Sequence, residues 1–185
     1  PEARIIGHDR DEASTDEAIK RGVIEESATW RDLGSCDVVL IAVPVRQMQD
    51  VLAALSPVLS EGVVLTDAGS TKGAVIDAAR TVLNDRIAQF VPGHPIAGRE
   101  KSGVAAAAGE LFEERHVVLT PLPENSPETV DKIEALWQAC GARVVRMDAP
   151  GHDRVFASVS HLPHAIAFAL VDELVVLDSG STDRT

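Results

Sequence analysis

Short apolar runs alternate along the chain with longer stretches of mixed polarity. Within each run the apolar residues are consecutive, with no alternation of apolar and polar positions, and many are β-branched. This pattern is typical of strands buried on both faces of a parallel sheet. They are Ile5–Ile6, Val38–Val43, Val63–Leu65, Phe90–Val91, Val117–Leu119 and Val144–Val145. Apolar residues at three- and four-residue spacing predict helices at Ala13–Arg21, Gln47–Leu59, Thr71–Leu83 and Pro127–Ala139. Strand alternating with helix predicts a doubly wound α/β fold with a mostly parallel sheet.

The helix predicted at 127–139 has the clearest boundaries. Ser126 can cap its start, Pro127 suits the first turn, and Gly141 follows its end. After Gly151 the pattern changes. The stretch from 152 to 177 is apolar on more than one side, as in a core or interface helix. Pro163 lies within it and cannot donate a helical hydrogen bond, so we expect a kink or a helix start there.

Charge and length narrow the functional classes. The 185 residues carry a net charge of −12, which argues against binding nucleic acid or an anionic membrane surface. No apolar run reaches the roughly 18 residues needed to span a bilayer. Cys36 and Cys140 match no metal or redox spacing, so we expect reduced core thiols in a cytoplasmic protein. A strand begins almost at residue 1 and a polar tail follows an unfinished helix, so we expect a fragment.

Ligands of doubly wound sheets bind at the carboxyl ends of the strands, where the first run delivers Asp9 and Arg10. An acid there can accept hydrogen bonds from the ribose of a dinucleotide. It can equally cap a helix beginning near Ser14. The glycine fingerprint G-x-G-x-x-G should lie roughly 20 residues before such an acid. The motif is absent from this chain. We therefore expect the first strand and its phosphate-binding turn to be missing.

The next two runs end in further candidate residues. Val43 and Pro44 can form a flat edge for a ring or a ribose, or simply a tight strand exit. Ser70 can cap the helix expected from Thr71, the better reading for an isolated serine, or direct its hydroxyl into the ligand cleft. Lys72 lies too early for the spacing of a P-loop.

His94 is the strongest candidate for chemistry. Gly93 allows the backbone to turn before it, and Pro95 restricts it to an extended conformation. We therefore predict a stiff loop at the end of a strand, which is a common support for a general acid or base. A lone loop histidine is more often a surface or capping residue. Arg99 and Lys101 follow in a polar stretch that is either a solvated loop or an anion-binding loop.

A second pair of histidines precedes and follows Pro163. His161 and His164 are three residues apart and would face the same way on a helix. Their spacing is not that of a zinc-binding helix and no third ligand is evident, so we expect no metal. Two buried, hydrogen-bonded histidines, or histidines lining a substrate cleft, are the readings left open.

Several motifs together resemble the prephenate and arogenate dehydrogenases of tyrosine biosynthesis. They are D-A-G-S-T-K-G from Asp67, V-P-G-H-P-I-A-G-R-E-K-S-G from Val91, L-F at Leu111, H-D-R at His152 and S-H-L-P-H from Ser160. The resemblance extends to about Leu174. It implies an NAD(P)-binding Rossmann-like domain at residues 1–149 and the beginning of an all-helical dimerisation domain at residues 150–185. It also implies a homodimer with the active site between the two domains.

The resemblance implies oxidative decarboxylation of prephenate, with hydride transfer to NAD and loss of carbon dioxide. His94 then resembles the catalytic histidine that takes the proton of the ring hydroxyl, and Ser70 the serine that assists at that hydroxyl. Substrate-binding residues would be His161, His164, Arg99 and Lys101. Cofactor-binding residues would be Asp9, Arg10, Val43, Pro44 and Ser70. Asp9 favours NAD, although the neighbouring Arg10 leaves NADP possible.

Two departures and three alternatives remain. The glycine fingerprint is absent, and so is the arginine that the family's helical domain supplies to the substrate carboxylate. One alternative is an arogenate or cyclohexadienyl dehydrogenase that uses arogenate or NADP. Another is a hydroxyacid or phosphogluconate type of dehydrogenase, which would need a catalytic lysine that residues 152–172 lack. A non-catalytic nucleotide-binding module is the third.

Overall fold

The computed structural model describes residues 3–98, 103–163 and 166. Its strands are short and follow the predicted apolar runs, with two additions at Glu26–Ser27 and Gly93–Pro95. The strands are β1 (Ile6–Gly7), β2 (Glu26–Ser27), β3 (Val38–Ile41), β4 (Val64–Asp67), β5 (Phe90–Val91), β6 (Gly93–Pro95), β7 (His116–Leu119) and β8 (Arg143–Arg146). The helices are α1 (Glu12–Lys20), α2 (Trp30–Leu33), α3 (Met48–Leu55), α4 (Gly73–Leu83), α5 (Pro127–Ala139) and α6 (Ala149–Phe156).

The strands form three hydrogen-bonded groups, ordered β1-β2, β3-β4-β5 and β6-β7-β8. All pairs are parallel except β6 with β7, which is antiparallel. Because β5 and β6 are separated by Pro92 alone, the chain joins the second group directly to the third. The predicted α/β fold with a mostly parallel sheet is thereby confirmed.

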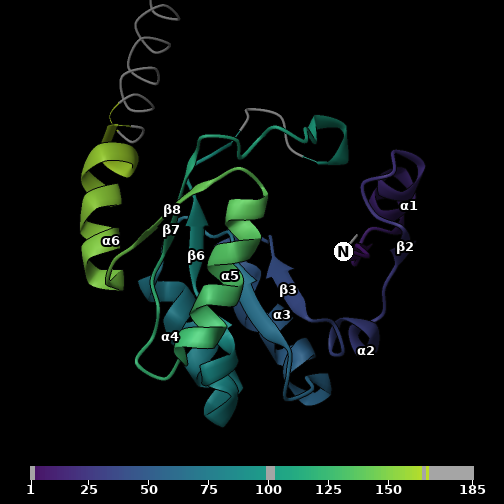
Figure 1. The fold of residues 1–185 in the computed structure, drawn as a ribbon, viewed down its shortest axis with the longest axis horizontal. Helices are drawn as coiled ribbons and strands as arrows, with labels where there is room; N and C mark the ends of the chain where they lie inside the picture. Colours follow the sequence, from purple (N-terminus) through teal and green to yellow (C-terminus); the bar gives the residue numbers. More distant parts are fainter. Residues whose placement is uncertain (1–2, 99–102, 164–165, 167–185) are drawn as a thin grey trace, which may run out of the picture.

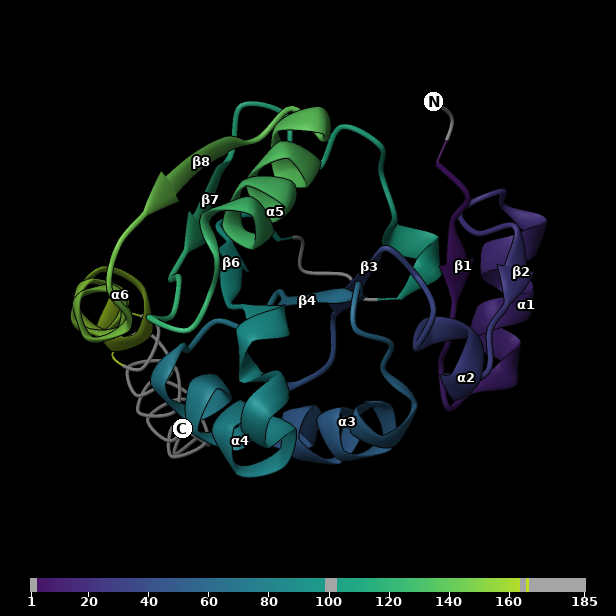
Figure 2. The ribbon, with the colours of Figure 1, turned by 60° about the horizontal axis from the view of Figure 1, so that its bottom comes forward.

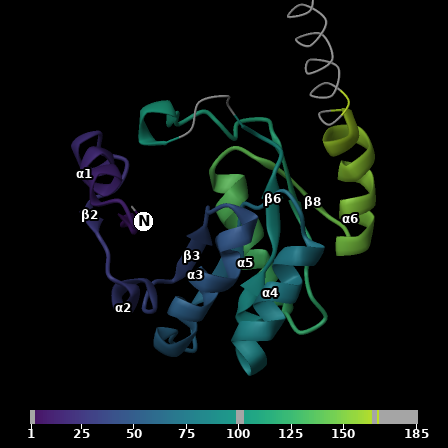
Figure 3. The same cartoon turned by 180° about the vertical axis from the view of Figure 1, so that it is seen from behind.

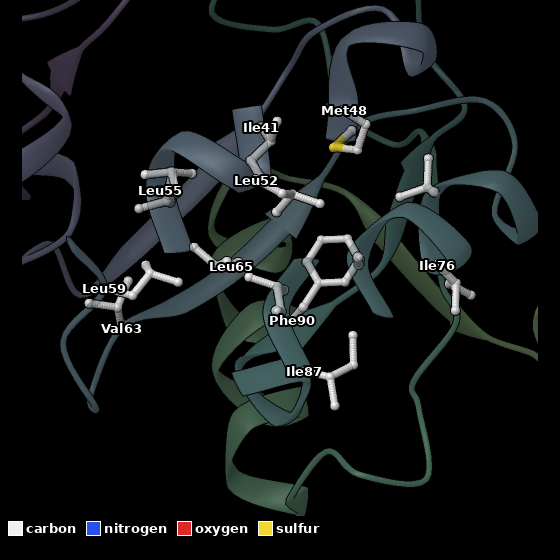
Figure 4. Packing of buried hydrophobic residues seen from close by; sticks show 14 of the residues in the cluster. Ile41, Met48, Leu52, Leu55, Leu59, Val63, Leu65, Ile76, Ile87 and Phe90 are labelled. Atoms are coloured by element: carbon white, nitrogen blue, oxygen red, sulfur yellow. The ribbon is translucent and has the colours of Figure 1, made fainter. Parts of the chain in front are cut away.

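Helices cover both faces of the central strands (Figure 2). α3 and α4 pack on one face, where the buried cluster includes Leu52, Leu65, Ala79 and Phe90. Figure 4 shows the Phe90 ring among Leu52, Leu65 and Ile87. α5 covers the other face, where Trp137 and Ile133 pack with strand residues such as Val91 and Leu119. Burial of both faces explains why the strands read as continuous apolar runs.

Two groups of secondary-structure elements lie on opposite sides of this core. β1, β2 and α1 form one flank and α6 forms the other, as Figures 1 and 3 show from opposite directions. After α6 the helix passes into a π-helical turn at Ala157–His161, which ends two residues before Pro163. No helix starts at Pro163; the helical backbone instead widens in the turn that precedes it. Within the described residues, no helix is long and apolar enough to cross a membrane.

Several local predictions can be compared with the structure. α5 has the predicted bounds, and the Ser126 side chain accepts a hydrogen bond from the Thr129 amide as its cap. The helix predicted at 47–59 was too long, because short 3₁₀ turns at Val45–Gln47 and Ser56–Val58 flank α3. Both cysteines are free thiols. The placement of Cys140 in the core is wrong, because Cys140 is exposed, whereas Cys36 is half-buried and packs against the core cluster.

Candidate active site

A buried ion pair joins the end of β4 to the start of β6. Asp67 and Lys72 both have 0% of their side chains exposed, and Lys72 Nζ lies 2.6 Å from Asp67 Oδ2. The ammonium also donates to the carbonyl oxygen of Gly93. Asp67 in turn accepts hydrogen bonds from the Gly93 amide at 3.0 Å and from the Gly69 amide at 2.8 Å. These contacts fix the loop that contains Ser70 and the backbone of Gly93, the residue before His94, to the same buried ion pair.

Burial acts on both members of this pair. Desolvation raises the pKa of Asp67 and lowers the pKa of Lys72, while their attraction for each other opposes both shifts. Neither group reaches solvent, so we assign the pair a structural role. Removing one partner would leave the other as an unpaired charge in the interior.

The start of α4 is capped from a distant part of the chain. Asp153 on α6 accepts hydrogen bonds from the backbone amides of Lys72 and Gly73, each at 2.8 Å. Burial raises the pKa of Asp153, but these amides and His152 outweigh it and leave the pKa lowered. The alternative in which Ser70 caps this helix is therefore wrong. α4 begins at Gly73, its cap is supplied by α6, and the Ser70 side chain is exposed.

His94 lies where β6 meets α6. Its Nδ1 atom is 2.8 Å from Nε2 of His152, and its ring packs edge-on against Phe156 at a centroid distance of 5.0 Å. His94 is half-buried, whereas His152 is fully buried. The predicted loop at His94 is wrong in form, because His94 pairs with Val118 across β6 and β7. The sheet fixes the backbone of His94 more firmly than a loop would.

The contact network continues from His152 to Asp153, whose Oδ1 atom lies 2.7 Å from Nδ1 of His152. Carboxylate, buried imidazole and half-buried imidazole thus form a continuous hydrogen-bonded series. His152 and Asp153 belong to the H-D-R motif, for which the sequence alone indicated no role. One local signal was nevertheless present. Both residues fall in the first turns of α6, whose start is marked by the capping residue Asp148.

The candidate cofactor residues lie away from this series. Asp9 and Arg10 are exposed directly after β1, and Asp9 Oδ1 accepts a hydrogen bond from the Asp11 amide at 2.9 Å. Asp11 caps α1, so the alternative in which Asp9 is the cap is wrong. Val43 is half-buried and Pro44 exposed directly after β3. In Figure 2, β3 and β4 lie between β1 and α6.

The structure therefore places Ser70, His94 and the start of α6 around the Asp67–Lys72 ion pair. Asp9 lies in the flank formed by β1, β2 and α1. Arg99, Lys101 and His164 lie outside the described residues, as does the side chain of His161. Among the residues that the structure does describe, no three His, Cys, Asp or Glu side chains are grouped to hold a metal ion.

Models of known protein families match both parts of the chain. A family model described as "Prephenate dehydrogenase, nucleotide-binding domain" matches residues 1–146. A second, described as "Prephenate dehydrogenase, dimerization domain", matches residues 148–184. The junction between the two matches falls immediately before α6, the helix that contacts His94.

Individual relatives have related names. The prephenate dehydrogenase of Bacillus subtilis is 39% identical over 176 residues, which cover 94% of this chain and 47% of that protein. The cyclohexadienyl dehydrogenase of Zymomonas mobilis is 42% identical over 135 residues, covering 73% of this chain and 45% of that protein. The chain thus spans about half the length of these curated relatives.

A solved structure gives the same result for the fold. Prephenate dehydrogenase from Aquifex aeolicus, in complex with hydroxyphenyl propionate and NAD+, superposes with a TM-score of 0.87 at 38% identity. The alignment covers 94% of this chain and 61% of that one. On its motifs, its fold and these matches, the chain belongs to the prephenate dehydrogenase family.

Proposed function

We propose that the full-length protein catalyses the NAD-dependent oxidative decarboxylation of prephenate to 4-hydroxyphenylpyruvate. The observation that carries this proposal is the position of His94, whose ring contacts His152 and Phe156 of α6. The histidine therefore lies at the junction between the regions that match the nucleotide-binding and dimerization domains. A base there can meet a cofactor held by the first region and a substrate held between the two.

The residues present fit a nicotinamide dinucleotide. Asp9 offers an exposed carboxylate after the parallel strand β1, where ribose hydroxyls are bound in this class of fold. Val43 and Pro44 offer a partly exposed apolar edge after β3. When bound, NAD would accept the hydride that leaves the carbon bearing the ring hydroxyl.

His94 would accept the proton of that hydroxyl as the hydride departs, and the exposed hydroxyl of Ser70 would hydrogen-bond the same oxygen. Loss of carbon dioxide makes the ring aromatic, which supplies the driving force. We further propose that His161, His164, Arg99 and Lys101 bind the substrate. Arg99 would pair with its side-chain carboxylate.

Arogenate is the competing substrate, and the Zymomonas mobilis relative is named for the broader cyclohexadienyl activity. An arginine near the side chain should disfavour the extra ammonium group of arogenate. If Arg99 binds there, Arg99→Gln narrows the difference in kcat/KM between the two substrates. An unchanged ratio would show that Arg99 does not contact this part of the substrate.

The assembly and location follow from the same reading. We infer a domain boundary near residue 149, where β8 has ended and α6 begins, and a homodimer formed through the helical domain. Support comes from the match of residues 148–184 to a dimerization domain. We propose the cytoplasm as the location of the protein.

The test is turnover by the full-length protein of prephenate and of arogenate, each with NAD and with NADP. The proposal expects NADH formation to be fastest with prephenate. Higher kcat/KM with arogenate would favour the alternative substrate. Binding of NAD without turnover of either substrate would instead support a non-catalytic nucleotide-binding module.

A further inference from the structure

We propose that Asp153 and His152 position His94 by fixing which of its ring nitrogens carries the proton. The inference rests on the proposed role of His94 as the base. Its basis is the series of two hydrogen bonds from Asp153 Oδ1 to His152 Nδ1 and from His152 Nε2 to His94 Nδ1, at 2.7 and 2.8 Å.

The first step is set by Asp153. Its two oxygens accept hydrogen bonds from the amides of Lys72 and Gly73, so both face donors rather than acceptors. These amides belong to the start of α4, where the partial positive charge of a helix favours a carboxylate anion. An ionised carboxylate can only accept hydrogen bonds. Nδ1 of His152 must therefore carry a proton and donate it to Asp153.

The second step follows from the burial of His152. A fully buried imidazole is least costly in its neutral form, and the charge of Asp153 is already met by the α4 amides. Neutral His152 with its proton on Nδ1 has an unprotonated Nε2, which is an acceptor. The bond between the two histidines then requires His94 to donate from Nδ1. The proton of neutral His94 is thereby assigned to Nδ1, and its Nε2 is basic.

The surrounding groups keep this arrangement in place. Phe156 packs against both imidazoles, at centroid distances of 5.0 Å from His94 and 4.6 Å from His152. Asp67 and Lys72, which hydrogen-bond Gly93 just before His94, form an ion pair in which the two charges compensate each other. Among the described residues, Asp153 is a charged group in direct contact with the two-histidine series.

The consequence for the reaction is a simple proton balance. The hydroxyl proton of the substrate moves to Nε2 of His94, while Nδ1 keeps its proton and its bond to His152. His94 becomes an imidazolium whose charge is stabilised through His152 by the Asp153 carboxylate. His152 and Asp153 neither gain nor lose a proton, so they are positioning residues. A carboxylate that orients a catalytic imidazole in this way is known from serine proteases.

Nitrogen-15 NMR of histidine-labelled full-length protein tests the inference without relying on activity. At a pH where His94 is neutral, its Nε2 should show the shift of an unprotonated nitrogen and its Nδ1 that of a protonated one. His94→Asn assigns the signals. The reverse tautomer in the wild-type protein, with the proton on Nε2, would overturn the inference directly.

Asp153→Ala supplies a second test. Alanine offers no acceptor for the proton on His152 Nδ1, so the tautomers of His152 and His94 are no longer fixed. We then expect part of the His94 population to carry its proton on Nε2, and kcat to fall with KM nearly unchanged, because that part lacks the base while substrate contacts remain. Asp148→Ala is the matched control, since it removes a capping carboxylate from the same helix without touching the histidines.

The outcomes separate this inference from the proposed function. An unchanged His94 tautomer in Asp153→Ala, or an equal loss of kcat in Asp148→Ala, would overturn the positioning role. If the wild-type protein turned over neither prephenate nor arogenate, the proposed function would fail. The tautomer of His94 would still decide whether Asp153 and His152 set its proton.

Discussion

Asp67 and Lys72 form a fully buried ion pair whose ammonium also binds the carbonyl oxygen of Gly93, the residue before His94. The pair lies at the carboxyl end of the central strand β4 and connects three segments of the candidate site. Because neither charge reaches solvent, its contribution depends on both partners being present.

Asp67→Asn should therefore destabilise the full-length protein by about 3–5 kcal/mol, since it leaves the Lys72 ammonium buried without its counter-charge. The Asp67→Leu/Lys72→Met double variant removes both charges and should cost less than the sum of its single variants. Urea unfolding of all the variants measures this coupling. Glu124→Gln, in the partly exposed pair with Arg80, is the control and should change the free energy of unfolding much less, because solvent screens that pair. Additive single effects at Asp67 and Lys72 would contradict the account.

Gly93 should tolerate no side chain. A Cβ atom there would lie 3.0 Å from the Asp67 carbonyl oxygen, 3.2 Å from Thr66 Oγ1 and 3.3 Å from Leu119 Cδ2. Gly93→Ala should therefore displace β6 or its neighbours by a few tenths of an ångström, and we expect it to cost about 1–3 kcal/mol. We also expect a lower kcat. Gly62→Ala meets no atom within 4 Å and is the control. Equal stability of the two variants would show that β6 moves freely.

The cap by Asp153 should make stability depend on pH. Its pKa is lowered in the folded protein, because the α4 amides and His152 outweigh the effect of burial. A carboxyl with a lowered pKa stabilises the fold above its unfolded pKa, about 3.9, and this contribution is lost as pH falls through the folded pKa. Asp153→Asn should thus be less stable than wild type at pH 7, with a difference that shrinks below about pH 4. A difference that grows with acid would contradict the assignment.

Asp9 should favour NAD over NADP, because its exposed carboxylate can accept hydrogen bonds from ribose hydroxyls and repels a 2′-phosphate. Asp9→Asn should raise kcat/KM with NADP relative to NAD. Asp16→Asn removes the same charge from the exposed face of α1 and should leave the ratio unchanged. A wild-type preference for NADP would show that Arg10, rather than Asp9, determines cofactor choice.

Much of the fold could be predicted from sequence because its signals are local. The buried strands are visible as apolar runs. The ends of α5 are marked by a capping serine and a first-turn proline at its start and by a glycine just after its end. β6 was missed because glycine and proline on either side of His94 indicate a loop. The strand tolerates Pro95 because its flanking hydrogen bonds use the Pro92 carbonyl and the Ile96 amide instead.

The interactions around His94 could not be predicted in this way. His94 and His152 are 58 positions apart, and Asp153 caps a helix that begins 80 positions earlier. No periodicity in the sequence connects such residues. For Lys72, the sequence spacing excludes a P-loop lysine and indicates no other role. Lysine is rarely buried without a partner, and the Gly93 carbonyl oxygen that completes its site is 21 positions away in the sequence.

His94→Asn tests the central claim most directly. The variant keeps a hydrogen-bond donor and loses the base, so kcat for prephenate in the full-length protein should fall about 10²–10⁴-fold while the affinity for NAD barely changes. The decline of wild-type kcat at low pH, caused by protonation of His94, should also vanish. His116→Asn, at an exposed histidine of β7, is the control and should behave as wild type. A His94→Asn protein with near-normal kcat, or with its acid limb intact, would contradict the account and place the base at His161 or His164.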